Sequence, residues 1–561
     1  MGLTRGGARL HLLLLLPAAA LVAALVLLPY RSVPFQRADG AWVELPAPHR
    51  LKHISDAWDY LQQARQIASG AGFSSLFTYV PFLPESVTPG GGPRVASQDP
   101  QTTAPAAFPQ FWRQPGYPAL LAGVFALSGS AHPDAMLLLQ ACFILLLPMA
   151  TYVLGRTLLP PGWAALAALW TLLAPVVLGA REPLVTTTLF ASLVALLLAA
   201  VLVARRPIAW LGAGLLLGAT ALLRLETWIL LPGLLAAVWT SRRGMRLSAA
   251  LLLLGGAALV VLPWHLRLIA LTGDPFFNAT SLLFHDTRAF PGWEASRTLA
   301  VRAVSPWAFV AAHPGDVATK TGLDLARFLR DLALLPSPFL APFLWLAILR
   351  RGGEPRRRAF LAGLVTATVA VVAVLAPMEY APRFLGPLVP AFAVGAALGM
   401  SRLPARRGLL ASAATLVGAV LLAASLGARG SEESALMAAR GFNALLSEPG
   451  LRARAEASVV LTDAPTLYAW IWNRPAVWAP RPEDLPQVRA LLPGSIALLT
   501  CAAGRGDTLE RDLAEAYAAQ GGTRAGSGCP SGVVWEEVRP GAACVSSPFL
   551  RRCGRPWPSR T

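Results

Sequence analysis

Charged residues are scarce in this chain of 561 residues. Asp, Glu, Lys and Arg together make up 14% of it, against about 25% in an ordinary soluble domain. Lysine is almost absent, and of the 48 basic residues only Lys52 and Lys320 are lysines. Hydrophobic residues make up 55%, and the mean hydropathy is +0.53. These values exclude an ordinary cytosolic enzyme and a disordered chain, and they are typical of a membrane protein.

Cysteine is also rare, and its placement is uneven. Of the five cysteines, Cys142 lies in an apolar run, whereas Cys501, Cys529, Cys544 and Cys553 lie within the last 61 residues. An even number in one polar region fits two disulfides in an oxidising compartment, and four free thiols fit equally well. Three pairings are open. No spacing of His, Cys and carboxylates resembles a zinc site, so we predict no metal and no cofactor.

The formal net charge is +18, and its distribution matters more than its size. A basic stripe on a soluble face would indicate nucleic acid. Here the arginines stand at the ends of apolar runs, where membrane topology requires them, and we find no nucleic-acid motif. We therefore predict a lipid bilayer as partner and no nucleic acid.

The apolar residues fall into runs of membrane length. The sequence predicts an α-helical polytopic membrane protein with about eleven transmembrane helices. We prefer a retained first span to a signal peptide, because the run is long and no small-residue cleavage site is clear. The predicted spans are residues 10–28, 134–155, 162–180, 184–204, 208–223, 227–240, 247–269, 334–349, 359–377, 383–400 and 408–427.

The connections between these runs alternate in charge. One set is rich in arginine and holds Glu354 as its only acid, which marks it as cytoplasmic. The other set is balanced and contains the pairs Arg181 with Glu182, Arg224 with Glu226, and Glu379 with Arg383. This assignment places the N-terminus in the cytoplasm and the C-terminal part outside, in a multi-pass protein of the cytoplasmic or inner membrane of a bacterium.

Two domains are expected, a transmembrane module over 1–429 and an extracytoplasmic α/β domain over 430–561. The module has large outer loops over about 30–133 and 270–333. Segment 116–130 is too short to span, so we expect an interfacial or re-entrant helix there, on the outer face. Segment 316–334 has an amphipathic helical pattern. In the second domain we expect helices over 431–447 and 509–520 and strands over 459–462, 495–500 and 533–538.

The first outer loop contains the most informative motif. It includes Asp56-Ala-Trp58-Asp59-Tyr60 in a helical pattern that ends near Gly70. Further segments follow at the predicted outer face, and they are Arg113-Gln-Pro-Gly-Tyr117-Pro, Arg181-Glu182-Pro, Pro263-Trp-His-Leu-Arg267 and Tyr380-Ala-Pro-Arg383. In order and sidedness, these motifs resemble the GT-C superfamily of integral-membrane glycosyltransferases. They are similar to its polyprenyl-phosphate-mannose protein mannosyltransferase, aminoarabinose transferase and oligosaccharyltransferase families.

The resemblance implies a sugar donor linked to polyprenyl phosphate and an acceptor that is a glycolipid, a glycan or a protein. It implies Asp56 as the base, and helix capping is the plain alternative for that residue. Asp59 is the weaker acid, and Tyr60 and Tyr117 join it as expected substrate-binding residues. A departing phosphate needs cations at the interface, for which Arg267 and Arg383 come first and Arg113 third, with interfacial snorkelling as the alternative.

Two points stay open for the remaining outer residues. Glu182 is expected to orient the acceptor or to bind a divalent ion, and a plain surface pair with Arg181 is the alternative. Arg224 and Glu226 are expected to pair with each other.

Two other functions compete with glycosyl transfer. Many-span proteins are often transporters or lipid flippases, although we find no internal repeat and most charges lie at span ends. A polymerase or ligase that uses diphosphate-linked glycans would be chemically close to the first hypothesis.

Overall fold

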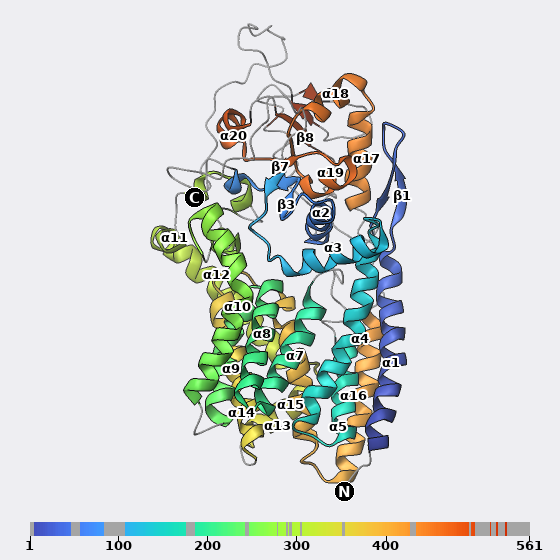
Figure 1. Cartoon of the computed structure of the whole chain (residues 1–561), viewed down its shortest axis with the longest axis vertical. Helices are drawn as coiled ribbons and strands as arrows, with labels where there is room; N and C mark the ends of the chain where they lie inside the picture. The colour runs from blue at the N-terminus through green and yellow to red at the C-terminus, as the bar shows by residue number, and fades with distance from the viewer. Residues whose placement is uncertain are drawn as a thin grey trace.

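The structure is a computed structural model of the whole chain (Figure 1). It describes residues 5–46, 56–83, 107–174, 186–241, 246–275, 277, 279–287, 290, 294–302, 306–350, 354–426, 434–492, 495–499, 517, 523–524 and 533–535. A long bundle of helices occupies one half of the molecule, and a layer of strands and short helices covers one end of the bundle.

Each apolar segment predicted to span the membrane contains a helix. The bundle helices are α1 (Arg5–Leu27), α4 (Asp134–Arg156), α5 (Pro161–Leu172), α7 (Thr187–Val203), α8 (Pro207–Leu223), α9 (Thr227–Ser241), α10 (Arg246–Thr272), α13 (Ala341–Leu349), α14 (Pro355–Leu375), α15 (Val389–Met400) and α16 (Ala405–Leu426). The 3₁₀ helix η7 (Pro382–Leu388) leads directly into α15.

Length and composition single out four helical runs in the described part of the chain as able to cross a membrane. They are Asp134–Arg156, Arg246–Thr272, Pro355–Leu375 and Pro382–Met400. Several other apolar helices, among them α7 and α8, have 10–17 residues, and seventeen residues rise about 26 Å. The chain is thus a multi-pass membrane protein, and the number of eleven spans stays a prediction.

The predicted span 334–349 differs from the helix that is observed. Only Ala341–Leu349 is a bundle helix there, and Leu334 instead ends the preceding helix α12 (Pro314–Leu334). Pro336 and Pro338 stand between the two helices. Proline has no backbone N–H to donate and disfavours helical conformation in the residue before it. The helix therefore ends before these prolines, and a new helix begins after them.

Small residues let neighbouring bundle helices approach closely. Helices α8 and α10 meet at Gly214 and Gly256, and a Cβ at Gly214 would lie 2.4 Å from the Leu253 carbonyl oxygen. Such contacts are typical of helix packing in membranes, where dispersion and close backbone approach replace the hydrophobic effect.

The arginine-rich connections gather at one end of the bundle, near the start of α1 (Figure 1). Arg402 after α15 donates to the Arg350 carbonyl after α13 over 2.5 Å. Arg357 in α14 donates to the Leu158 carbonyl after α4 over 3.4 Å. We name this the basic end. These bonds show that connections separated widely in sequence lie side by side.

Four further helices lie outside the bundle, on the side away from the basic end. They are α2 (Asp56–Ala68), α3 (Gly116–Ser128), α11 (Pro306–Ala312) and α12. In Figure 1, α3 runs across the end of the bundle rather than along it. The expected helix over 116–130 is confirmed, as is the amphipathic helix over 316–334.

A six-stranded sheet forms the centre of the covering layer. Its order is β4-β7-β6-β8-β10-β9, where β4–β7, β6–β7 and β6–β8 are parallel and the last two pairs are antiparallel. The strands are β4 (Phe77–Thr78), β6 (Val460–Thr462), β7 (Ala476–Trp478), β8 (Ile496–Leu499), β9 (Thr523–Arg524) and β10 (Val533–Trp535). The first outer loop thus supplies the edge strand β4 of a sheet whose other strands come from the last hundred residues.

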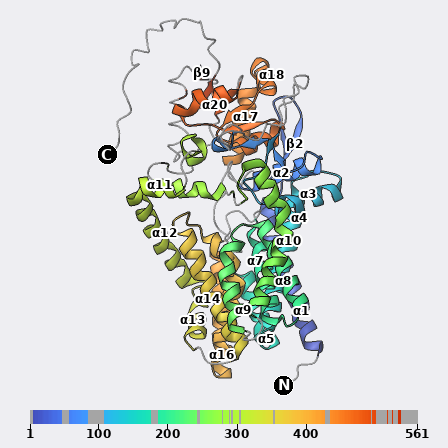
Figure 2. The same ribbon diagram turned by 60° about the vertical axis from the view of Figure 1, so that its left-hand side comes forward.

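Short helices and two small hairpin-like ladders complete this layer (Figure 2). The helices are α17 (Ser434–Leu446), α18 (Pro449–Ala457), α19 (Pro465–Trp472) and α20 (Leu485–Leu491), and the ladders pair β1 (Val33–Gln36) with β2 (Trp42–Leu45) and β3 (Ser74–Ser75) with β5 (Phe108–Pro109). The expected helix over 431–447 and the three expected strands match α17, β6, β8 and β10. Except for Tyr517, the expected helix over 509–520 lies outside the described residues, as do the four late cysteines.

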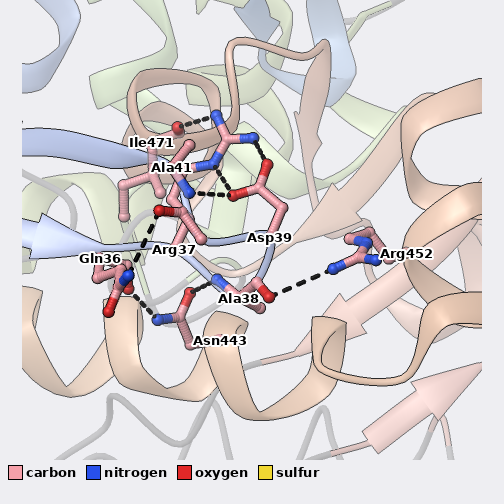
Figure 3. Close-up of polar contacts among 9 residues, drawn as sticks. Gln36, Arg37, Ala38, Asp39, Ala41, Asn443, Arg452 and Ile471 are labelled. Carbon is pink, nitrogen blue, oxygen red and sulfur yellow. Dashed lines mark hydrogen bonds and ion pairs between the residues drawn. The ribbon is translucent and has the colours of Figure 1, made fainter.

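Hydrogen bonds join the β1–β2 turn to the C-terminal helices (Figure 3). The Asn443 side chain accepts a bond from the Ala38 backbone N–H (3.1 Å) and donates to the Gln36 carbonyl (2.6 Å). Arg37 donates to the Ile471 carbonyl over 3.2 Å, and Arg452 donates to the Ala38 carbonyl over 3.3 Å. The two segments therefore form one continuous structure above the bundle.

Candidate functional site

Two carboxylates lie on the first turn of α2. Asp56 and Asp59 are three residues apart, so their side chains share one face of the helix. The opposite face carries Ala57, Trp58 and Leu61, which are fully buried in an apolar cluster. That buried face fixes the orientation of α2 and leaves both acids on the other side of the helix.

Arg113 joins the two carboxylates. It comes from the connection between β5 and α3, and its Nε donates to Asp59 Oδ2 over 2.6 Å. Its Nη2 donates to Asp56 Oδ1. Gln63, one turn further along α2, donates to the other oxygen of Asp59 over 2.7 Å. Asp59 is 1% exposed and Asp56 is 22% exposed, so the second acid is held inside and the first faces the open side.

A second arginine reaches Asp56 from a late segment of the chain. Arg383 in η7 places Nη1 3.4 Å from Asp56 Oδ2. Residues 56, 113 and 383, distant in sequence, therefore converge on one point, as the resemblance implied. Arg224 lies nearby and pairs with Glu226, which confirms the expected pair, and it also donates to the Thr186 hydroxyl over 3.3 Å.

The two acids have opposite pKa shifts. Burial raises the pKa of Asp56, but the Arg113 and Arg383 guanidiniums outweigh burial and lower it to about 2. Burial also raises the pKa of Asp59, and there Arg113 does not offset it. Asp56 is therefore ionised at neutral pH and stabilised by two cations, whereas Asp59 holds a proton more readily.

The other expected site residues lie at different distances from this centre. The Tyr60 ring is 5.7 Å from the Arg113 guanidinium carbon. Tyr117 is buried, packs edge-on against Tyr60 and accepts a bond from Gln140 over 2.9 Å. Arg267 donates to the Phe73 carbonyl over 2.7 Å rather than to either acid. Glu182 lies outside the described residues.

A cavity of about 450 Å³ opens beside Arg383. Most of its wall is apolar, and it includes Phe384, next to Arg383, and Gln114, next to Arg113. The remaining lining residues are Ala221, Leu222, Leu225, Glu226, Trp228, Ile229, Val261, Trp264, His265, Leu268, Pro275, Phe277, Leu283, Val374, Leu375, Met378 and Glu379. An apolar chain ending in a charged group would fit a cavity of this kind.

Sequence reasoning placed Glu379 at the outer face without a role, and it missed two other participants in the site. Glu379 lines the cavity four residues before Arg383, and burial raises its pKa. Gln63 fixes Asp59, and Tyr79 lines a small pocket with both acids. The spacing of Glu379 and Arg383 was a usable signal, whereas Tyr79 follows a strand of two residues that no sequence pattern reveals. Within the described residues, no group of three or more His, Cys, Asp or Glu side chains could hold a metal ion.

No protein-family model matches the chain, and a search of curated proteins finds no match. Solved structures do match. The oligosaccharyltransferase of Archaeoglobus fulgidus with Zn and sulfate aligns with a TM-score of 0.50 at 15% identity, over 83% of this chain and 62% of that one. The same enzyme, AglB, in complex with an inhibitory peptide and a dolichol-phosphate gives 0.51 at 14% identity, over 87% and 69%.

The chain has a GT-C fold. The resemblance drawn from the motifs is thereby confirmed at the level of fold. A structure of ArnT from Cupriavidus metallidurans bound to undecaprenyl phosphate also aligns, with a TM-score of 0.45 at 16% identity, over 82% of this chain and 74% of that one. The alignment with the first oligosaccharyltransferase structure covers less than two thirds of that protein's chain.

Proposed function

We propose that the chain is a membrane glycosyltransferase that moves a sugar from a polyprenyl-phosphate donor to a hydroxyl group outside the cytoplasm, with inversion. One observation carries the proposal. The Asp56 carboxylate pairs with the guanidiniums of Arg113 and Arg383, and the residues that follow these two arginines, Gln114 and Phe384, line an apolar cavity. A carboxylate, two cations and an apolar wall are the groups that such a reaction needs.

The two parts of the donor would bind at different places, the prenyl chain in the cavity and the phosphate at a cation. The prenyl chain would enter the apolar cavity, and its phosphate would lie at Arg383, which is 35% exposed. The pair between Arg383 and Asp56 is long at 3.4 Å, so a phosphate can take this arginine with little loss. Arginine suits phosphate because its planar fork donates two parallel hydrogen bonds. Dolichol-phosphate bound to AglB supports this assignment by analogy of fold.

The transfer step uses Asp56 as the base. The acceptor oxygen attacks the anomeric carbon of the sugar and forms the new C–O bond. The bond between that carbon and the phosphate oxygen breaks, and its electron pair leaves with the phosphate. The acceptor proton passes to the Asp56 carboxylate and then to solvent. No metal takes part in this scheme, and Glu182 keeps its predicted role of orienting the acceptor.

Donor binding would also activate the base. With Arg113 and Arg383 both beside it, Asp56 has a pKa of about 2 and is a weak base. When the phosphate draws Arg383 away, one of the two cations that lower this pKa is lost, and the pKa rises toward its ordinary value. The carboxylate would thus gain basicity only when a donor is in place.

The charge of the two ends of the bundle supports the sidedness of the reaction. The arginine-rich basic end belongs in the cytoplasm by the positive-inside rule. Helix α2, which begins at Asp56, and the sheet lie at the other end (Figure 1), which would put the acceptor, a glycolipid, a glycan or a protein, outside. The protein would then act in the cytoplasmic or inner membrane.

The test is the Asp56→Asn variant of the purified protein in lipid vesicles, supplied with polyprenyl-phosphate sugars and a membrane extract as acceptor. We expect transfer to fall by at least about 100-fold, because removal of a general base typically costs that much. Asp39→Asn is the matched control, since Asp39 pairs with Arg37 on the β1–β2 turn, away from Asp56.

Two outcomes would count against the proposal. Full transfer by the Asp56→Asn variant would remove the base from the scheme. Vesicles that move the lipid across the bilayer without any covalent product would favour the transporter or flippase hypothesis instead.

A further inference from the structure

A small pocket lies where three parallel strands of the sheet end. Tyr79 follows β4, Trp478 is the last residue of β7, and Thr466 follows the turn after β6. These three residues and Pro465 line the pocket together with Asp56, Asp59 and Arg113. In α/β sheets, ligands bind at the carboxyl ends of the parallel strands. The ligand-binding edge of this sheet therefore coincides with the carboxylates of α2.

Among the residues that the structure describes, two buried polar atoms of this pocket find no hydrogen-bond partner. They are the Thr466 hydroxyl and the Trp478 indole N–H, and each residue is 6% exposed. Most buried polar groups in folded proteins are paired, because an unpaired one loses its bonds to water without replacement. Both residues come from the C-terminal segment and line the pocket with Asp56, Asp59, Tyr79 and Arg113, so a ligand bound in the pocket would satisfy them.

The C-terminal wall is held firmly in place. Arg65 in α2 donates to the Trp470 carbonyl of α19 over 3.0 Å, and its guanidinium lies 3.6 Å from the centre of the Trp470 ring. The Trp470 indole N–H in turn donates to the Glu44 carbonyl over 2.9 Å. On the other side, the Tyr79 and Trp478 rings lie 5.4 Å apart. Because the walls are fixed on both sides, the pocket is preorganised rather than a loose gap.

We propose that this pocket binds a hydroxyl group of the sugar that is transferred, with Thr466 and Trp478 as the residues that select the sugar. The inference rests on the proposed function. The pocket volume of about 30 Å³ fits a hydroxyl group and excludes a whole ring. A sugar hydroxyl both donates and accepts, and the pocket offers carboxylates that accept, an indole N–H that donates and a threonine hydroxyl that does either.

The donor sugar fits this position better than the acceptor does. The phosphate at Arg383 would fix the sugar within reach of Asp56, whose carboxylate also lines the pocket. The small pocket, of about 30 Å³, admits one substituent of a ring that is already anchored. A glycan or peptide acceptor would need an open groove, so we treat acceptor binding as an outcome of the test.

The experiment measures binding to the full-length protein, so that it does not depend on transfer. The probes are polyprenyl phosphate without sugar and a panel of polyprenyl-phosphate hexoses and pentoses. Deoxy analogues of the tightest binder then remove one hydroxyl at a time. For wild type we expect the sugar to tighten binding about tenfold over the bare lipid, and one deoxy analogue to lose most of that gain.

Thr466→Val removes the hydroxyl and keeps the side-chain shape, and Trp478→Phe removes the indole N–H and keeps a smaller aromatic ring. Each should abolish the discrimination against that one analogue while the affinity for bare polyprenyl phosphate stays within about twofold of wild type. Thr151→Val is the matched control, because this buried hydroxyl donates to the Leu147 carbonyl of its own helix α4. Unchanged thermal unfolding temperatures would verify that the variants are folded.

The possible outcomes separate the two proposals. If both variants discriminate like wild type, or if wild type gains nothing from the sugar, the sugar pocket is refuted. If donor binding is unaffected and only the KM for the acceptor rises, the pocket belongs to the acceptor and the inference is wrong. If wild type selects sugars through Thr466 but never transfers them, the pocket stands and the glycosyltransferase proposal fails.

Discussion

The two ends of the helical bundle use arginine in opposite ways. At the basic end, Arg357 and Arg402 donate to backbone carbonyls at the ends of neighbouring helices. At the other end, Arg113, Arg224 and Arg383 each pair with a carboxylate. The same side chain thus closes helix ends on one side, and it holds acids in defined positions on the other. An arginine that pairs with a carboxylate is therefore a better indication of a reactive site than an arginine that merely stands at a span end.

The Arg113→Gln variant should have the largest effect, which is a loss of stability that depends on pH. It leaves Asp59 buried without its cation, and breaking such a pair typically costs about 3 to 5 kcal/mol. Since burial already raises the pKa of Asp59, the native state of the variant binds a proton more tightly than the unfolded chain does. Its stability is therefore highest at low pH and is lost as pH rises through the native pKa. Thermal unfolding in detergent across pH measures this effect.

The double variant Arg113→Gln with Asp59→Asn removes the unpaired charge. It should recover much of the lost stability and abolish the added pH dependence. If it unfolds as early as the single variant, Asp59 is not the cause of the instability.

Arg383→Gln and Arg402→Gln make the same chemical change at opposite ends of the bundle. We expect Arg383→Gln to raise the KM for a polyprenyl-phosphate donor about 30-fold, because a charge-assisted hydrogen bond to phosphate is worth about 2 kcal/mol. Arg402→Gln should leave this KM within about twofold of wild type. Equal effects of the two variants would remove the functional distinction between the ends.

Glu379 gives a smaller effect that depends on pH. Its carboxylate lines the cavity beside Arg383, and it faces Arg383 and Lys320 as cations and Asp56 and Asp286 as anions. Burial raises its pKa, so protonation on lowering the pH removes a negative charge from the phosphate site. We expect donor affinity to rise as pH falls through this pKa and Glu379→Gln to bind several-fold tighter at neutral pH. A donor titration of both proteins at several pH values measures it, and identical pH profiles would contradict it.

The smallest effect should be a change in the stability of the protein, caused by a substitution at the basic end. Arg357→Gln removes a single bond of 3.4 Å to the Leu158 carbonyl, and the unfolding free energy should change by no more than about 1 kcal/mol. Donor KM should not change. A loss as large as that of Arg113→Gln would mean that this end carries a buried charge network after all.

The sequence was a sufficient guide to the bundle and to the polar centre. Apolar runs predict helices because hydrophobicity and length are local properties, and each predicted run contains one. Asp56 and Arg383 could be named because charged residues at span ends are few. Arg113 ranked third from sequence, yet it makes the closest contacts with both acids. Its rank failed because a connection between short elements has no periodicity from which its path could be inferred.

The sheet that completes the site was harder to predict. Strands β6 and β8 are recognisable as short runs of Val, Ile and Leu, whereas β4 has two residues and pairs across almost four hundred positions. Pairing over such distances leaves no local pattern. For the same reason Thr466 and Trp478 could not be linked to Asp56, although they line the same pocket.

The insertion of β4 has a consequence for biosynthesis. Its partner β7 is made only after all the bundle helices, and it must reach the same side of the membrane before the edge of the sheet can close. Until then Tyr79 and Trp478 remain apart, and the wall behind the two acids is missing. A nascent or truncated chain would therefore form the apolar cavity before the small pocket, and under the proposed function its activity would appear only once the C-terminal strands have been made.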